Sequence, residues 1–201
     1  MADIELNWPL DIRPAQQSFY IKPLTTRFEN PFTGQVQVLE RDAARWVTRI
    51  ELRRPEKDAR RLDALVAALR GSVGHVFIPH FVRLKARGSL AGSPQLASGT
   101  GTTLTITGFT PDAPGVLIAG DYIQTSQGRV HMVLQDVDAD ENGEATVPVA
   151  PRLREAVTTG PLVTDNCRVR MRLTGDESNE NLTDTRLQTA FSLDFIEVLP
   201  Q

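Results

Sequence analysis

Cysteine, histidine and aromatic residues are scarce in this chain of 201 residues. Cys167 is the single cysteine, and the three histidines are scattered along the sequence. One thiol cannot form an intramolecular disulfide, and neither residue type is clustered with the spacing of metal ligands. Disulfide scaffolds and zinc fingers are therefore excluded. Aromatic residues make up only 6% of the chain, so we expect a core of valine, isoleucine and leucine.

A surplus of one charge and long apolar runs are also lacking. The chain has 22 basic and 25 acidic residues, so its net charge of −3 gives no overall field toward nucleic acid or anionic membranes. No apolar run is long enough to span a bilayer, and Asp3 and Glu5 stand where a signal peptide has basic residues. We expect a soluble protein made in the cytoplasm, without membrane insertion.

Motifs for catalysis are absent as well. The sequence has no phosphate-binding loop, no dinucleotide fingerprint and no paired carboxylates of a glycosidase. Cys167 lies on the apolar face of a predicted strand, which favours a buried, inert thiol over a nucleophile. We therefore predict that the protein is not an enzyme and has no cofactor.

Residues 138–144 reproduce the first half of a calcium-binding loop, with oxygen ligands at positions one, three and five and Gly143 at position six. The second half fails, because position twelve is Val149 and both flanks are typical of strands. An Asn-Gly pair between alternating apolar runs favours a hairpin instead. We predict no metal site.

One amphipathic helix is predicted near residues 56–70. Leu62, Leu65, Val66 and Leu69 follow the spacing of one helical face, and Gly71 is a suitable left-handed stop. Before the helix, residues 1–34 contain four prolines and predict an extended arm with short strand pieces, which gains its burial at an interface. The remaining predicted elements of this half are two neighbouring antiparallel strands at 35–39 and 45–52, and an edge or bulged strand at 75–82.

The middle of the chain has a different composition. Residues 88–101 are small and uncharged, as in a linker or a long exposed loop. Closely spaced turns then separate short apolar runs, which predicts a small antiparallel barrel or sandwich. Its strands are expected at 103–109, 116–118, 122–125, 130–137 and 145–149.

The sequence thus predicts a mainly β (α+β) fold with two parts. Residues 1–87 and 166–201 form a discontinuous β-sandwich domain with the flanking helix, and residues 88–165 form an inserted all-β barrel or sandwich module. Near the C-terminus, four alternating apolar residues between 167 and 173 predict a strand with one buried face and one arginine-rich face.

The basic residues comprise 19 arginines and three lysines, and arginine is the residue favoured at protein interfaces. An arginine stripe on a strand can face a neighbouring subunit, line a pore or lie in water, and these alternatives stay open. The candidate interface or channel-facing residues are Arg168, Arg170, Arg172, Arg49 and Arg53.

Several short features follow one another in a fixed order. The predicted helix leads into Arg70, Gly71 and Gly74 and then a strand. Later come a Gly-Asp-aromatic turn, a strand ending in Val-x-x-Asp, an acidic hairpin with glycine, and a Pro-x-Leu-Arg sequence. These are Gly120–Tyr122, Val133 with Asp136, Gly143, and Pro151 with Leu153 and Arg154. Together these segments, about half of the chain, resemble the tail-tip proteins of long-tailed, siphovirus-like bacteriophages.

The resemblance implies a distal tail protein or a related minor tail protein, a structural protein of the virion tail tip. In that family a β-sandwich with a flanking helix forms a ring, commonly a hexamer, around the DNA channel, and a second β-module decorates the outside. The resemblance implies a homo-oligomer, hexameric or trimeric, with the tail tube protein and tail-tip or hub proteins as partners. DNA would be passing cargo only.

An alternative is that the inserted module binds a ligand such as a carbohydrate, as small β-barrels often do. Sugar sites usually present exposed aromatic side chains. Phe109 and Tyr122 are the only aromatic residues of 88–165, which weighs against this alternative.

Overall fold

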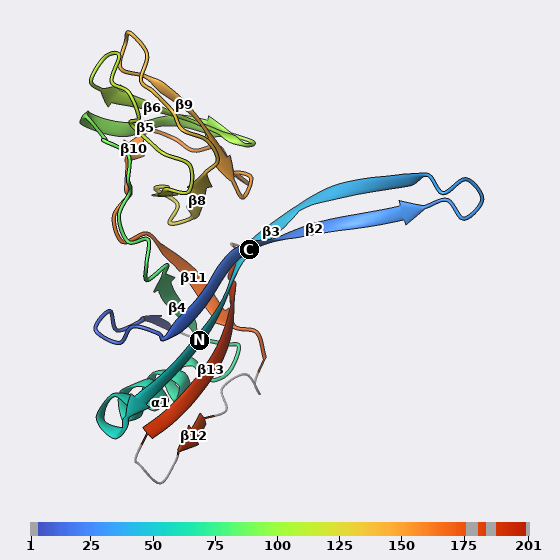
Figure 1. The fold of residues 1–201 in the computed structure, drawn as a ribbon, viewed down its shortest axis with the longest axis vertical. Helices are drawn as coiled ribbons and strands as arrows, with labels where there is room; N and C mark the ends of the chain where they lie inside the picture. Colours follow the sequence, from blue (N-terminus) through green and yellow to red (C-terminus); the bar gives the residue numbers. More distant parts are fainter. Residues whose placement is uncertain (1–3, 176–180, 184–187, 200–201) are drawn as a thin grey trace.

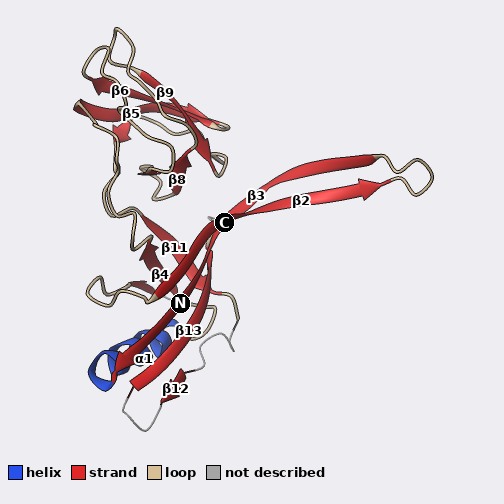
Figure 2. Ribbon diagram, in the orientation of Figure 1, coloured by secondary structure: helices blue, strands red, loops and turns tan. Residues whose placement is uncertain are grey.

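The computed structural model describes residues 4–175, 181–183 and 188–199. Its described part is mainly β with one helix, which confirms the predicted mainly β class with a flanking helix (Figures 1 and 2). The strands form two sheets, here named sheet A and sheet B. Sheet A contains β1 (Glu5–Asn7), β2 (Gln16–Glu29), β3 (Val36–Pro55), β4 (His75–Pro79), β11 (Arg168–Leu173), β12 (Asn181–Thr183) and β13 (Gln188–Glu197). Sheet B contains β5 (Gly92–Thr100), β6 (Thr103–Phe109), β7 (Tyr122–Gln124), β8 (Val130–Val133), β9 (Ala145–Ala150) and β10 (Gly160–Pro161).

Sheet A is built from the two ends of the described chain. Its strand order is β1-β4-β11-β13-β3-β2, with β12 paired to β13, and all pairs except β1 with β4 are antiparallel. The strands of sheet B all lie between β4 and β11 in sequence. The chain therefore leaves sheet A after β4, builds sheet B, and returns through β11.

The core of sheet A lies on one face, under the helix α1 (Glu56–Leu69). Strand alternation produces this face, because every second residue of β11 and of most of β13 is buried, as the sequence predicts. The helix buries Ala59, Leu62, Val66 and Leu69 against it, so the predicted helix is confirmed. The helix ends one residue earlier than predicted: Arg70 already has the left-handed backbone conformation, and Gly71 has it too.

A long hairpin corrects the prediction for the first fifty residues. Instead of an irregular arm and two short strands at 35–39 and 45–52, β2 and a single uninterrupted β3 pair along their lengths, with a bulge between Lys22 and Leu24. The distal half of this hairpin projects away from both sheets (Figure 1). The alternation at 35–39 ends at Leu39, and residues 36–42 are all exposed, so the sequence does not show that β3 continues without interruption; pairing with β2 holds this part extended.

Two further predictions are wrong. Residues 92–100 are strand β5 rather than a linker, because the small residues allow close packing: a Cβ on Gly99 would lie 2.5 Å from Leu104 Cδ2. The predicted edge strand at 75–82 ends at Pro79 and is an interior strand between β1 and β11. Pro79 is tolerated because it is the last residue of the strand.

Sheet B curls into a half-barrel with the order β10-β5-β6-β9-β8-β7. An isolated bridge between Gln124 of β7 and Val163, just after β10, links the two ends of the curl. The strand predicted at 103–109 is confirmed, and those predicted at 122–125, 130–137 and 145–149 correspond to β7, β8 and β9. The segment predicted at 116–118 contributes only a bridge between Leu117 and Val137.

Candidate functional site

Five arginines predicted as interface residues lie on one face of sheet A. Paired residues of neighbouring antiparallel strands point to the same side of a sheet. Arg172 pairs with Ile196, and Asp194, on the same side of β13, pairs with Arg49. The face opposite α1, here called the arginine face, therefore carries the whole set: Arg168, Arg170, Arg172, Arg49 and Arg53.

The arginine face is open in the isolated chain. Along β3, β11 and β13, every described residue that points to this side is half-buried or exposed. Some of the charge is compensated within the sheet: Arg49 Nε lies 2.9 Å from Glu51 Oε1, and Arg170 Nη2 lies 2.8 Å from Glu5 Oε1. Arg49 Nη2 also donates to Ser192 Oγ of β13, so the arginine face carries a mixed, polar surface.

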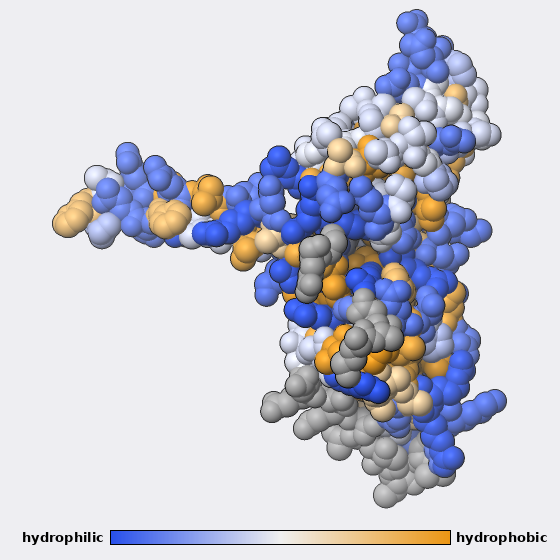
Figure 3. Space-filling view, turned by 180° about the vertical axis from the view of Figure 1, so that it is seen from behind, coloured by the Kyte–Doolittle hydropathy of each residue, from blue (hydrophilic) through white to orange (hydrophobic). Residues whose placement is uncertain are grey.

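The projecting part of the hairpin, here called the arm, consists of residues 24–41. All of its residues except Thr26 are exposed, including large apolar ones (Figure 3). Phe32, near the tip, is 96% exposed, and Val38 is 64% exposed. The strand register places Leu24, Phe28 and Leu39 on one side of the arm and Val36 and Val38 on the other. An isolated two-stranded hairpin with its apolar side chains exposed is only marginally stable in water.

A buried ion pair joins the two sheets. Arg129, in the turn before β8, donates through Nε and Nη2 to Glu197 Oε1, at 3.3 and 3.2 Å. The side chains are 10% and 3% exposed. Trp46 of β3 completes the junction: its backbone N–H donates to Glu197 Oε2, and its Nε1–H donates to the carbonyl of Val130 at 2.7 Å.

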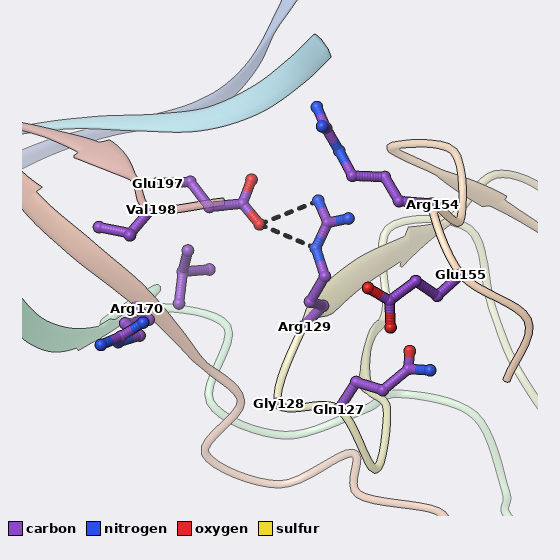
Figure 4. A pocket seen from close by; sticks show the side chains of 9 residues that line it. Gln127, Gly128, Arg129, Arg154, Glu155, Arg170, Glu197 and Val198 are labelled. Atoms are coloured by element: carbon purple, nitrogen blue, oxygen red, sulfur yellow. Dashed lines mark hydrogen bonds and ion pairs between the residues drawn. The ribbon is translucent and has the colours of Figure 1, made fainter. Parts of the chain in front are cut away.

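A cavity of about 230 Å³ adjoins this ion pair. Residues of both sheets line it, and Figure 4 shows Arg129 between Glu197 on one side and Arg154 and Glu155 on the other. Burial, with the nearby positive charge of Arg129, lowers the pKa of Arg154. The lining residues are Gln127, Gly128, Arg129, Arg154, Glu155, Val169, Arg170, Glu197 and Val198.

The predicted acidic hairpin has its oxygens occupied by the backbone. Asp140 Oδ1 accepts hydrogen bonds from the N–H groups of Asn142 and Glu144, and Asp138 Oδ1 accepts one from Gly115. In the described ranges, no group of three or more histidine, cysteine or acidic residues is placed to hold a metal ion. The carboxylates thus shape the turns.

Phe109 and Tyr122 bear on the carbohydrate alternative. Both are buried, at 4% and 5% exposure, and Tyr122 packs against Trp46 with ring centroids 5.6 Å apart. Neither ring is available to stack on a sugar.

Among the described residues, no helix has the length and apolarity needed to cross a bilayer.

No protein-family model matches this sequence, and no curated protein is significantly similar to it.

Sequence reasoning missed the residues of the junction. Glu197 follows Phe191, Leu193 and Phe195 at the same spacing of two, so strand parity alone would have placed this acid on the buried face. An acid at a core position requires a buried partner. The partner, Arg129, lies beside a glycine turn, where no periodic pattern reveals its burial.

Cys167 is buried, which confirms the predicted burial of its thiol. Its sulfur lies 3.4 Å from the Val163 carbonyl, and burial raises the pKa of the thiol from 9.0 to about 12. Because the thiolate is the reactive form, we expect a disulfide reagent at pH 8 to modify the native protein at least about a hundredfold more slowly than the urea-unfolded chain. Equal rates would show that the thiol is accessible.

Proposed function

We propose that this protein is a structural component of a bacteriophage tail tip, a ring-forming adaptor that connects the tail tube to the tip and surrounds the DNA channel. The observation that carries the proposal is the arm, which exposes apolar side chains on both sides of a two-stranded hairpin. Such a surface gains stability when a second copy covers it. The resemblance of the helix and of residues 117–157 to tail-tip proteins is the reason for proposing a phage tail tip rather than another kind of assembly.

The arginine face supports the same proposal. Five arginines on one open sheet face favour contact with protein over plain solvation, because arginine makes planar, multidentate contacts at interfaces. In this proposal, residues 1–87 and 166–201 form the ring, and residues 88–165 form the module outside it. The ring is a hexamer or a trimer, with the tail tube protein and tip proteins as neighbours.

Assembly through the arm can be tested with a triple variant, Phe28→Thr, Val38→Thr and Leu39→Thr. Threonine preserves strand propensity, while removing the apolar surface that a neighbour would bury. We expect light scattering after size exclusion to show a discrete oligomer for the natural protein, and at least about tenfold weaker assembly for the variant.

The matched control is Val82→Thr, because Val82 is 86% exposed and lies outside the arm. This variant should assemble like the natural protein, and negative-stain images of both should show rings. A natural protein that remains monomeric at all concentrations and salt conditions would contradict self-assembly. Equal weakening by the control would contradict the role of the arm.

A further inference from the structure

The cavity at the sheet junction contains an arginine whose hydrogen bonding is incomplete. Arg129 uses Nε and Nη2 on Glu197, while Nη1 is buried and has no hydrogen-bond partner in the described part of the chain. Glu197 does not engage Nη1 in this arrangement: its Oε1 accepts from Nε and Nη2, and its Oε2 accepts the Trp46 N–H. A buried charged donor without an acceptor is costly, so the site favours a further acceptor.

A second arginine lies on the same side of the cavity. Figure 4 shows the Arg154 side chain above that of Arg129, with its guanidinium directed away from it, and Glu155 on the side of Arg129 opposite Glu197. Arg154 is an exposed residue, and within the described residues no hydrogen bond engages its guanidinium. Partial burial, followed by the positive charge of Arg129, lowers its pKa. Arg129 and Arg154 thus line one cavity with donors that have no described partner, and arginine donors are the groups that bind oxyanions.

The size of the cavity limits the ligand. At about 230 Å³ it is smaller than the pockets that enclose drug-sized molecules, which hold roughly 300–1,000 Å³. Most of its lining residues carry a polar or charged group, but most of the lining surface is apolar and includes Val169 and Val198. It has room for one oxyanion and accompanying water.

We propose that this cavity binds a small oxyanion, with phosphate as its model, held by Arg129 and Arg154. The ligand oxygens accept hydrogen bonds from Arg129 Nη1 and from the Arg154 guanidinium. Glu155 is the competing group, because its carboxylate lines the same side and repels an anion. The site joins the two sheets, so an occupied cavity stabilises their junction. The proposal is independent of ring assembly.

The test is titration of the full-length protein with sodium phosphate at constant ionic strength, by calorimetry and by thermal unfolding. We expect saturable binding and a rise in Tm that sodium chloride does not reproduce. Arg154→Gln should weaken phosphate binding about tenfold or more, since one charge-assisted contact is lost. Glu155→Gln should strengthen binding, because it removes the competing charge without changing the shape of the side chain.

Arg152→Gln is the matched control, because Arg152 lies two residues away, is exposed, and pairs with Asp42 outside this cavity. It should leave binding unchanged within about twofold. A parallel titration with acetate distinguishes a phosphoryl from a carboxyl ligand, and Arg154→Gln weakens either one. Absence of saturable binding to both anions overturns the proposal, as does equal weakening by Arg152→Gln. Loss of stability in Glu155→Gln without any anion effect also overturns it, since Glu155 is then the acceptor.

Discussion

Replacement of Arg129 by methionine is expected to lower the free energy of unfolding by about 3–5 kcal/mol. The exchange preserves most of the apolar stem but leaves Glu197 buried, with a side chain 3% exposed and no counter-charge. An uncompensated carboxylate in such a site is strongly destabilising. Urea unfolding followed by tryptophan fluorescence measures the effect, because the buried indoles of Trp8 and Trp46 enter water when the chain unfolds.

The ion pair between Arg152 and Asp42 is the matched control. Its atoms are 3.1 Å apart, close to the 3.2 Å of the buried pair, but its side chains are 57% and 64% exposed. Arg152→Met should therefore cost less than about 1 kcal/mol. An Arg129→Met effect no larger than this would show that burial does not strengthen the junction.

A double variant separates the unpaired charge from the rest of the effect. Arg129→Met combined with Glu197→Gln removes both charges, while the amide oxygen of Gln can still accept the Trp46 N–H bond. We expect this combination to recover most of the stability lost in Arg129→Met alone. Additive losses would instead mean that the two residues act independently.

Sequence periodicity identifies the elements that have one buried side. The helix and β11 follow their predicted patterns because each packs one face against the core of sheet A. The uninterrupted pairing of the arm and the strand β5 are not revealed by such patterns, for different reasons. Residues 36–42 are exposed on both sides, while Gly99 in β5 makes close contacts that small residues allow and apolar alternation does not report.

Part of the candidate site could be predicted from the sequence, and part could not. The alternation within single strands identifies the five arginines as candidates. Their common face depends on how β13 pairs with β11 and β3, which brings together residues about 120 positions apart along the chain. The cavity forms only because the turn at Arg129 packs against the end of β13, which is distant in sequence. No single segment contains the information for that contact.

The single buried histidine, His131, is expected to make the protein less stable in mild acid. Its Nδ1 lies 2.7 Å from the Pro151 carbonyl, and because a carbonyl only accepts, Nδ1 carries the hydrogen and Nε2 is unprotonated. Burial lowers the pKa of His131 from 6.5 to about 4. Between these values the unfolded chain binds a proton that the folded chain does not, so stability falls as pH falls.

The loss between pH 6.5 and about 4 should amount to roughly 3 kcal/mol, measured by urea unfolding at a series of pH values. His131→Asn should flatten this slope, because Asn retains a donor for the Pro151 carbonyl but does not titrate. Burial also lowers the pKa of His80, so part of the slope persists. Asp11 and Asp140 have pKa values lowered from 3.8 and act below this window.

The same variant above pH 6.5 is the control for the substitution itself, because His131 is then neutral in both the folded and the unfolded chain. The stability difference there gives the cost of losing the imidazole, and a change of slope between pH 6.5 and 4 reports titration alone. If His131→Asn keeps the slope of the natural protein, protonation at residue 131 is not what destabilises the fold. A slope that is largely lost in His131→Asn identifies β8, the strand that follows the Arg129 turn, as the acid-sensitive element.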